Sequence, residues 1–311
     1  MSELRGVTVA VLGGDQRMVE IVRQARLVGA EVRVCGGPPR ATAAGAVAAA
    51  TVAEAVKGAK LIVCPVPAHG VGESLYAPFS TERLFLTADA LRGAAPGALI
   101  VVGRVSAVIG REANAAGVRA VGYSDDVLEI MHAVPTAEGA LKVAIENTET
   151  TVLGCPTLCI GLGRVGMSVA QLFRDMQAKV TLCARNPSQI ARAWAMGLEA
   201  VHLNRLAEVI DRFDLLISST SGLVLTRELL ERVREDTLVI DLCSPPGSVD
   251  FRAAEALGRK VVMIGTPETR DADVRGAHVI WARGQAGTAP RNAGYDEWQA
   301  IMRTVRQELL A

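Results

Sequence analysis

Short apolar segments alternate with segments of helical period along most of the chain, and the alternation starts afresh near the middle. Parallel strands joined by helical crossovers give this pattern, so we predict two Rossmann-like α/β domains, each a doubly wound parallel sheet. The expected strands are Val7–Leu12, Glu31–Cys35, Leu61–Val66, Ala98–Val102 and Val118–Gly122, then Thr157–Gly161, Lys179–Cys183, Ala200–Leu203, Asp214–Ser218, Thr237–Leu242 and Val261–Ile264.

Helical spacing of apolar residues follows the first strand of each unit, over Gln16–Val28 and Val165–Gln177. Between the units, Asp126–Thr150 predicts one or two helices interrupted near Pro135, because proline has no N–H to donate. Tyr295–Leu310 predicts a last helix, which by analogy with two-domain dehydrogenases packs on the first domain. The expected organisation is a Rossmann- or flavodoxin-like domain over 1–128 completed by helix 290–311, a helical connector over 129–150, and a dinucleotide-binding Rossmann domain over 151–289.

Composition excludes several classes of protein. Lysine plus arginine equals aspartate plus glutamate, giving zero net charge, so we expect no nucleic-acid partner and no anionic membrane surface. No apolar run approaches the ~20 residues that span a bilayer, and the start lacks the apolar core of a signal peptide, which indicates a cytoplasmic protein. The six cysteines form no C-x-x-C pair and the four histidines are scattered, so no metal site is expected.

The motif with the clearest chemistry is Gly161-Leu162-Gly163-Arg164-Val165-Gly166, which follows an apolar strand and opens an amphipathic helix. In a dinucleotide-binding turn the first glycine permits the tight turn, the second admits the pyrophosphate, and the third lets the helix pack on the strand. The free N–H groups of the helix start then face the phosphates. We therefore predict a nicotinamide dinucleotide site here, with a glycine turn that binds nothing as the alternative.

The end of the next strand decides which cofactor is favoured. An NAD site usually has an acidic residue there, ~20 residues after the glycines, to bind the ribose hydroxyls. This chain has Arg185 instead, followed by Asn186 and Ser188. A guanidinium attracts a 2′-phosphate and a carboxylate repels it, so the sequence favours NADP over NAD. The alternative for Arg185 is a solvated arginine at a strand end.

Two later strand ends are also expected at the cofactor, because ligands of this fold bind at the carboxyl ends of the strands. One carries Ser219, Thr220 and Ser221, and the other carries Asp241 and Cys243. Hydroxyl groups at these positions suit ribose and nicotinamide contacts. The alternative for Asp241 is a structural cap of the turn that follows it.

The first unit opens with Gly13-Gly14-Asp15-Gln16-Arg17, a strand-to-helix turn without the third glycine. We therefore predict no second dinucleotide site. Asp15 can cap the helix that starts at Gln16, and Arg17 can reach an anionic ligand from the first helical turn.

Taken together, these blocks resemble the family of the A subunit of dipicolinate synthase over nearly the whole chain. His132 departs from the asparagine expected before the second block, and Ala286 and Asn292 replace a proline and a threonine of the last. The blocks are Gly13-Gly14-Asp15-x-Arg17, Pro135-Thr136-Ala137-Glu138-Gly139, Gly161-Leu162-Gly163-Arg164-Val165-Gly166-Met167, Asp241-Leu242-Cys243-Ser244-x-Pro246-Gly247-x-x-Asp250-Phe251 and Ala286-Gly287-Thr288-Ala289-Pro290-Arg291-Asn292-Ala293-Gly294.

The resemblance implies an oxidoreductase of endospore-forming bacteria. It would oxidise a dihydrodipicolinate-type product of the lysine (diaminopimelate) pathway to dipicolinate during sporulation, with a nicotinamide cofactor. The partner implied is a flavoprotein-like B subunit, and a homo- or hetero-oligomer is expected.

A dicarboxylate substrate needs cationic or N–H partners. The candidate substrate-binding residues are Arg17, Arg104 and Arg291, together with Asp15, Thr136 and the backbone around Gly139. Glu138 and His132 are both candidates to accept the proton, because a free imidazole titrates near pH 6.5 while the carboxylate lies in the stronger motif. We expect Arg17, Thr136, Glu138 and Arg291 to line one cleft between the domains. For each of these residues a surface or structural role is the alternative.

Two other functions fit parts of the sequence. A 2-hydroxy-acid dehydrogenase shares the two-domain plan but needs a late catalytic histidine, and the single late one, His278, lies in a strand-like run. A non-catalytic NADP-binding subunit or redox sensor would keep the glycine turn and lack a substrate site.

Overall fold

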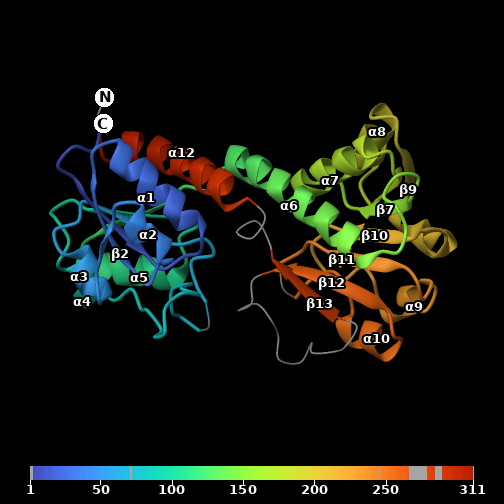
Figure 1. The fold of residues 1–311 in the computed structure, drawn as a ribbon, viewed down its shortest axis with the longest axis horizontal. Coiled ribbons are helices and arrows are strands. Elements are labelled where there is room, and N and C mark those ends of the chain that lie inside the picture. Colours follow the sequence, from blue (N-terminus) through green and yellow to red (C-terminus); the bar gives the residue numbers. More distant parts are fainter. Residues whose placement is uncertain (1–2, 71, 245, 266–278, 284–288, 311) are drawn as a thin grey trace. The chain divides into compact units, whose positions relative to one another are not determined.

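The computed structural model describes residues 3–70, 72–244, 246–265, 279–283 and 289–310 (Figure 1). Its contacts divide the chain into two units, 1–129 with 289–311, and 130–288. Each unit holds one sheet whose strand pairs are all parallel, which confirms the predicted α/β class.

The first sheet has the strand order β3-β2-β1-β4-β5-β6. This is the order of the Rossmann fold, and it reverses between β1 and β4, where ligands of such sheets collect. The sequence did not predict β3, a two-residue edge strand with both side chains exposed, because it lies in the alanine-rich segment 46–50, whose pattern does not distinguish a strand. The strands are β1 (Thr8–Leu12), β2 (Glu31–Cys35), β3 (Val47–Ala48), β4 (Leu61–Val63), β5 (Leu99–Val102) and β6 (Arg119–Gly122).

Helices cover both faces of this sheet, because alternate residues of a strand point to opposite faces. Val9 and Val11 of β1 pack with one helical layer, and Ala10 and Leu12 pack with the other. The first layer contains α1 (Arg17–Leu27), α2 (Arg40–Ala43) and α12 (Pro290–Glu308), and the second contains α3 (Val52–Val56), α4 (Ala88–Leu91) and α5 (Ala107–Ala116).

The second sheet has the order β13-β12-β11-β10-β7-β8-β9, again a Rossmann order, with its reversal between β7 and β10. The predicted strands are all present, and β13 extends the sheet by one more. They are β7 (Pro156–Ile160), β8 (Lys179–Ala184), β9 (Glu199–His202), β10 (Leu215–Ser218), β11 (Leu238–Asp241), β12 (Lys260–Gly265) and β13 (Val279–Arg283).

A single 22-residue helix, α6 (Asp126–Asn147), crosses the boundary between the units. The expected interruption at Pro135 is wrong, because the helix continues through this residue. Ala137, Ala140 and Ala144 of α6 share a core with α7, which fixes this part of the helix within the second unit. The other helices of that unit are α7 (Arg164–Asp175), α8 (Pro187–Ala195), α9 (Arg227–Leu230) and α10 (Phe251–Ala256), with the 3₁₀ turns η1 (Leu203–Glu208) and η2 (Ile210–Arg212).

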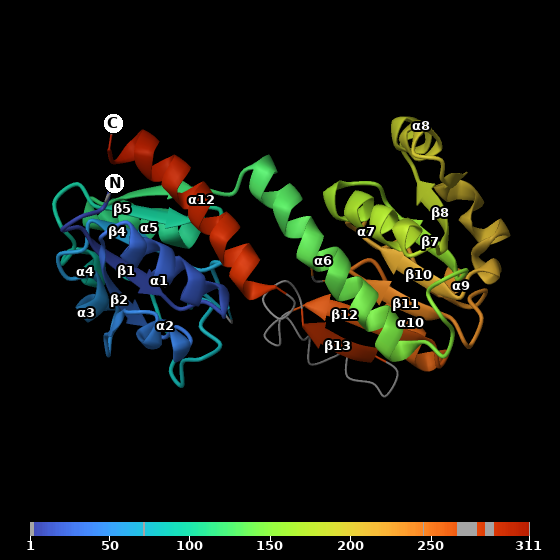
Figure 2. The same cartoon turned by 45° about the horizontal axis from the view of Figure 1, so that its top comes forward.

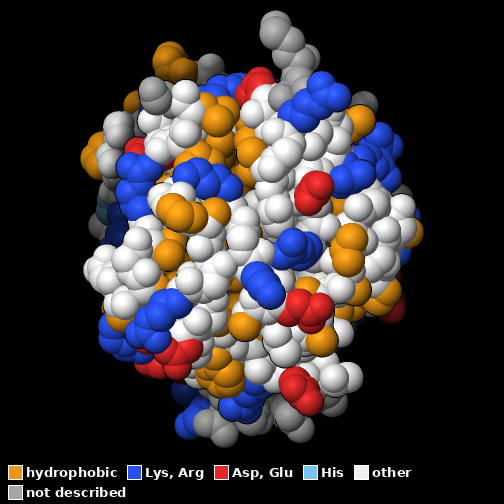
Figure 3. Space-filling model, turned by 90° about the vertical axis from the view of Figure 1, so that its left-hand side faces the viewer, with side chains coloured by type: hydrophobic (Ala, Val, Ile, Leu, Met, Phe, Trp, Pro, Cys, Tyr) orange, Lys and Arg blue, Asp and Glu red, His pale blue; other side chains and the backbone are white. Residues whose placement is uncertain are grey.

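In the first unit the C-terminal helix α12 lies alongside α1, as both ribbon views show (Figures 1 and 2). Trp298 is almost fully buried in the shared core. Gly294 makes the approach possible, since a Cβ there would lie 2.5 Å from the carbonyl oxygen of Arg17. The outer face drawn in Figure 3 mixes acidic, basic and apolar side chains, as a chain without net charge would.

A buried ion network joins α12 to the loop after β1. The Arg17 guanidinium donates to both carboxylate oxygens of Asp15, at 2.9 and 2.8 Å, to Glu297 Oε1 at 2.5 Å, and to the carbonyl oxygen of Val66. Tyr123 donates to the other oxygen of Glu297 at 3.4 Å. Burial raises the pKa of Glu297 to about 7, against the opposing effect of Arg17. Arg17 is therefore a structural cation that ties the two ends of the chain together.

Glu297 makes the stability of this unit depend on pH. Its pKa is higher in the folded protein than its ordinary value of 4.5, so its contribution is complete below pH 4.5 and is lost as pH rises through 7. We expect wild type to lose up to about 3 kcal/mol of unfolding free energy between pH 4.5 and 8 relative to Glu297→Gln. Urea unfolding at several pH values measures this.

The control is Glu308→Gln, which removes a partly exposed carboxylate from the same helix. Its pH profile should run parallel to that of wild type. Parallel profiles for wild type and Glu297→Gln would show that Glu297 is ionised throughout this range.

Candidate dinucleotide-binding site

The glycine turn between β7 and α7 has the three properties that a dinucleotide site requires. Gly161 has a φ of +92°, which is accessible to glycine at little cost, and its N–H donates to Cys183 O at 2.8 Å. A Cβ on Gly163 would meet no atom within 4 Å, whereas one on Gly166 would overlap the carbonyl oxygen of Gly161. The turn is thus open at Gly163 and closely packed at Gly166.

Arg164 and Val165 form the first turn of α7, directly after this opening. Arg164 is exposed, and Val165 packs against the core of the second unit. The helix N-terminus therefore stands at the open part of the turn, where its N–H groups can face an anion.

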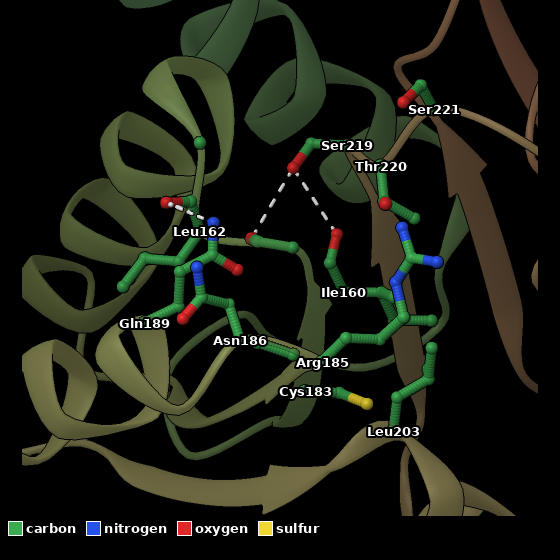
Figure 4. A pocket seen from close by; sticks show the side chains of 13 residues that line it. Ile160, Leu162, Cys183, Arg185, Asn186, Gln189, Leu203, Ser219, Thr220 and Ser221 are labelled. Carbon is green, nitrogen blue, oxygen red and sulfur yellow. Dashed lines mark hydrogen bonds between the residues drawn. The ribbon is translucent and has the colours of Figure 1, made fainter.

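A cavity of about 280 Å³ lies beside the turn, within the second unit (Figure 4). It is formed where β7, β8 and β10 end, at the reversal of strand order. Its lining contains the predicted residues Gly161, Gly163, Arg185, Asn186, Ser219, Thr220 and Ser221, together with Ile160, Leu162, Cys183, Ala184, Gln189 and Leu203.

The end of β8 presents a cation to this cavity. The Arg185 side chain is exposed, and Figure 4 shows its guanidinium on the side of the cavity where Thr220 lies. Within the described part of the chain it has no hydrogen-bond or ion-pair partner, and none of the cavity's lining residues is acidic. The geometry therefore leaves this guanidinium available to an anion.

The residues after Arg185 start α8. Asn186 Oδ1 caps this helix by accepting from the N–H and the hydroxyl of Ser188, at 2.9 and 2.8 Å. Ser188 itself does not line the cavity. Gln189 was not predicted from the sequence, yet its amide donates to Leu162 O at 3.3 Å and joins α8 to the glycine turn. The sequence feature that could have identified Gln189 is its position in the first turn of α8, the helix that follows β8.

The end of β10 is tied to the same turn. Ser219 Oγ lies 3.3 Å from the carbonyl oxygen of Ile160 and 3.4 Å from that of Gly161 (Figure 4). Thr220 and Ser221 continue the cavity wall. These hydroxyl groups stand where contacts to a bound nucleotide were expected.

Asp241 takes the structural alternative that the sequence left open. It is fully buried, and its carboxylate accepts from the N–H groups of Cys243 and Ser248 at 3.0 and 2.7 Å. Cys243 Sγ lies 2.9 Å from Thr220 O, and burial followed by the nearby Asp241 raises the pKa of this thiol to about 12. Neither residue lines the cavity. Both instead order the loop after β11.

The corresponding turn of the first unit is closed. The N–H of Gly13 donates to Cys35 O at 2.8 Å, as that of Gly161 does to Cys183 O, but here the next N–H, that of Gly14, donates to Tyr76 O at 2.7 Å. A Cβ on Gly13 would lie 2.5 Å from the same Tyr76 oxygen. Tyr76 thus occupies the space at this turn and the amide of Gly14.

The cationic substrate candidates of the first unit differ in access. Arg17 is 4% exposed and is bound by Asp15 and Glu297, so its guanidinium already has protein acceptors. The side chain of Arg104 is 78% exposed beside Glu129, and that of Arg291 is 79% exposed, 3.8 Å from Glu20. Arg104 and Arg291 therefore keep accessible guanidinium groups.

The candidates on α6 lie in the second unit. Thr136 is buried and donates to His132 O at 2.9 Å, and Gly139 lies inside the helix, so the expected backbone donors there are used by the helix itself. His132 is 8% exposed, while Glu138 faces solvent. The structure thus corrects the role of Gly139 and leaves Glu138 as the accessible carboxylate.

Some of the expectations lie outside the described residues, namely those on His278 and on 286–288. Among the described residues, no three His, Cys, Asp or Glu side chains gather as a metal site would require. No described helix combines the length and the apolar character that a membrane crossing requires.

Two Rossmann-type units, the second with an open glycine turn, define a dehydrogenase-type fold that supports a nicotinamide cofactor. Family models agree: residues 8–124 match the N-terminal domain of the dipicolinate synthase A subunit, and 143–265 match shikimate / quinate 5-dehydrogenase. The A subunit of dipicolinate synthase from Bacillus subtilis (strain 168) is 31% identical over 263 residues, which cover 84% of this chain and 88% of that protein. The chain therefore belongs to the family of dipicolinate synthase A subunits.

Solved structures give the same result. The dipicolinate synthase A subunit of Bacillus halodurans matches with a TM-score of 0.81 at 27% identity, over 97% of this chain and 98% of that one. The corresponding protein from Bacillus subtilis matches with a TM-score of 0.79 at 28% identity, over 99% of both chains. The resemblance found in the sequence blocks is thus confirmed.

The open position of Gly163 gives a test of the site. We expect Gly163→Val to fold normally, because its side chain meets no protein atom, and to lose at least ten-fold in NADPH affinity by filling the space for the pyrophosphate. Fluorescence titration with NADPH, beside circular dichroism, measures both effects.

Gly166→Val is the matched comparison in the same turn. Its side chain would collide with the backbone of Gly161, so this variant should unfold at a lower temperature. Unchanged NADPH binding by a well-folded Gly163→Val protein would place the cofactor elsewhere.

Proposed function

We propose that this protein is the A subunit of a dipicolinate synthase that oxidises a dihydrodipicolinate-type dicarboxylate to dipicolinate with NADP. Membership of the family and the open glycine turn support the reaction class. The observation that carries the choice of cofactor is Arg185, a cation without a described partner on a cavity whose lining has no carboxylate.

Several features of the cavity support a dinucleotide with a phosphate on its ribose. Gly163 leaves room for the pyrophosphate, the N-terminus of α7 supplies N–H groups, and Arg185 can pair with a 2′-phosphate. When bound, the nicotinamide supplies the acceptor for a hydride. Ser219, Thr220 and Ser221 supply hydroxyl groups for the sugar.

Conversion of the dihydro ring to the aromatic product removes one hydride and one proton. Bound NADP would supply the acceptor for the hydride, and the proton would pass to a base or to water. We propose Glu138 as this base, because its carboxylate is accessible on α6 while His132 is buried. Glu138 and the exposed Arg104 and Arg291 are the residues we propose for the substrate, and Arg17 acts by holding its unit together.

A B subunit is the proposed partner, since the relative is named as a subunit of dipicolinate synthase. We propose that this partner is flavoprotein-like and that the complex works during sporulation. The protein described here would then supply the dinucleotide site of the complex.

Arg185 gives the sharpest test of the cofactor. Charge-assisted hydrogen bonds of one arginine contribute about 1.5–3 kcal/mol, so Arg185→Ala should weaken NADPH binding roughly ten- to hundred-fold. NADH lacks the 2′-phosphate, and its affinity should change less than two-fold. Fluorescence titration of both cofactors measures the difference.

Arg192→Ala is the control for loss of one positive charge from the adjoining helix α8, away from the cavity lining. It should leave both affinities unchanged. Tighter binding of NADH than of NADPH by wild type would contradict the proposed cofactor.

The reaction itself is tested with dihydrodipicolinate-type substrate generated in the assay. Oxidised NADP should be reduced as dipicolinate forms, with and without the B subunit, and Gly163→Val should abolish both signals. Reduction with a 2-hydroxy acid alone would indicate a different dehydrogenase. Cofactor binding without turnover, even with the B subunit present, would indicate a non-catalytic subunit.

A further inference from the structure

The direction of the Arg185 side chain is not set by any described partner of its guanidinium. What the structure fixes is the backbone at the end of β8, from which this side chain extends. The parallel ladder between β8 and β9 ends at the pair Ala184 and His202, one residue before Arg185. The contacts of the backbone beyond this pair therefore decide the position from which the Arg185 side chain extends.

His202, the last residue of β9, binds the backbone of Arg185. Its Nε2 lies 3.1 Å from the carbonyl oxygen of Arg185. Because a carbonyl oxygen can only accept, Nε2 must carry the proton of this hydrogen bond. The side chain of His202 thus extends the attachment of β8 to β9 by one residue beyond the ladder.

The imidazole is itself held in place from its other side. With the proton on Nε2, Nδ1 accepts from the N–H of Asn204 at 3.3 Å, at the start of η1. On the far side of Arg185, Asn186 is fixed as the cap of α8. The backbone of Arg185 is therefore bound by His202 and is followed directly by the fixed Asn186. Leu203, next to His202, lines the same cavity.

We propose that His202 is a positioning residue for cofactor choice, which fixes the backbone of Arg185 so that its guanidinium meets the 2′-phosphate of NADP. This inference rests on the proposed function of Arg185. A long side chain loses rotamer freedom when it binds a ligand. If its backbone is already fixed, less conformational entropy is lost on binding. Supporting hydrogen bonds of this kind lock the geometry of the binding residue. We therefore expect His202 to affect the ligand that Arg185 distinguishes.

A purely structural role is the competing explanation, because the same bond also joins two strands. The two roles differ in what they change. Damage to the sheet would weaken NADPH and NADH alike, whereas loss of positioning would weaken NADPH and leave NADH nearly unchanged. The ratio of the two dissociation constants is therefore the quantity to measure.

Two variants of similar size separate the role of Nε2 as a hydrogen-bond donor from the role of the rest of the His202 imidazole. His202→Gln keeps an N–H donor near the position of Nε2. His202→Asn can still bond to Asn204 but is too short to reach Arg185 O. Each is made in wild type and in Arg185→Ala, and NADPH and NADH are titrated by fluorescence.

We expect His202→Asn to lower the preference for NADPH about three- to ten-fold, the effect of one hydrogen bond, with His202→Gln within about two-fold of wild type. In Arg185→Ala, where the guanidinium is absent, His202→Asn should not change the ratio further. Such non-additivity is the signature of two residues that act as one unit.

Three results would overturn the inference, and they are distinguishable. If wild type prefers NADPH and Arg185→Ala removes the preference, but His202→Asn keeps it, then Arg185 acts without His202. Equal losses for both cofactors in His202→Asn would show a structural role alone. If wild type has no preference for NADPH, the proposed cofactor fails and the role of His202 fails with it.

Discussion

The site depends on one close contact, in which α7 approaches β7 so nearly that no side chain fits between them. Gly166 has no Cβ, and any Cβ there would overlap the carbonyl oxygen of Gly161. This approach brings the first turn of α7, with its N–H groups, to the carboxyl end of the sheet. Ser219 and Gln189 then bind carbonyl oxygens of the same turn, at Gly161 and Leu162, so that β10 and α8 are positioned by it as well.

The two units have the same strand order up to the sixth strand, yet only the second presents an open turn at the reversal. The difference comes from what fills the space beyond the first strand. In the first unit, Tyr76 O accepts from Gly14 N and lies against Gly13. In the second, nothing lies within 4 Å of where a Cβ on Gly163 would stand. One topology can therefore serve as a binding site or as a packed scaffold, and the loops decide which.

Local patterns predicted most of the fold and the centre of the site, because both are encoded by neighbouring residues. Buried parallel strands appear in the sequence as apolar runs, and the glycine turn appears as three glycines at fixed spacing. The features that the sequence did not predict have a different origin. The two-residue strand β3 lies in an alanine-rich segment whose pattern does not distinguish a strand, and α6 continues through Pro135, with its alanines packed in the core that it shares with α7. The hydrogen bond between His202 and Arg185 joins residues on neighbouring strands, which spacing does not reveal.

Arg17 and Arg185 show most clearly why sequence alone does not assign a charged side chain. Each follows the end of a strand near a glycine turn, and each was a candidate for an anionic ligand. The carboxylate that decides the role of Arg17 is Glu297, 280 positions away in sequence, and its bond with Arg17 buries the cation. Arg185 meets no such partner among the described residues and stays exposed. A charged arginine can be buried without a large desolvation penalty only where acidic partners compensate its charge, so the position of acidic residues in the fold decides which arginine is left for a ligand.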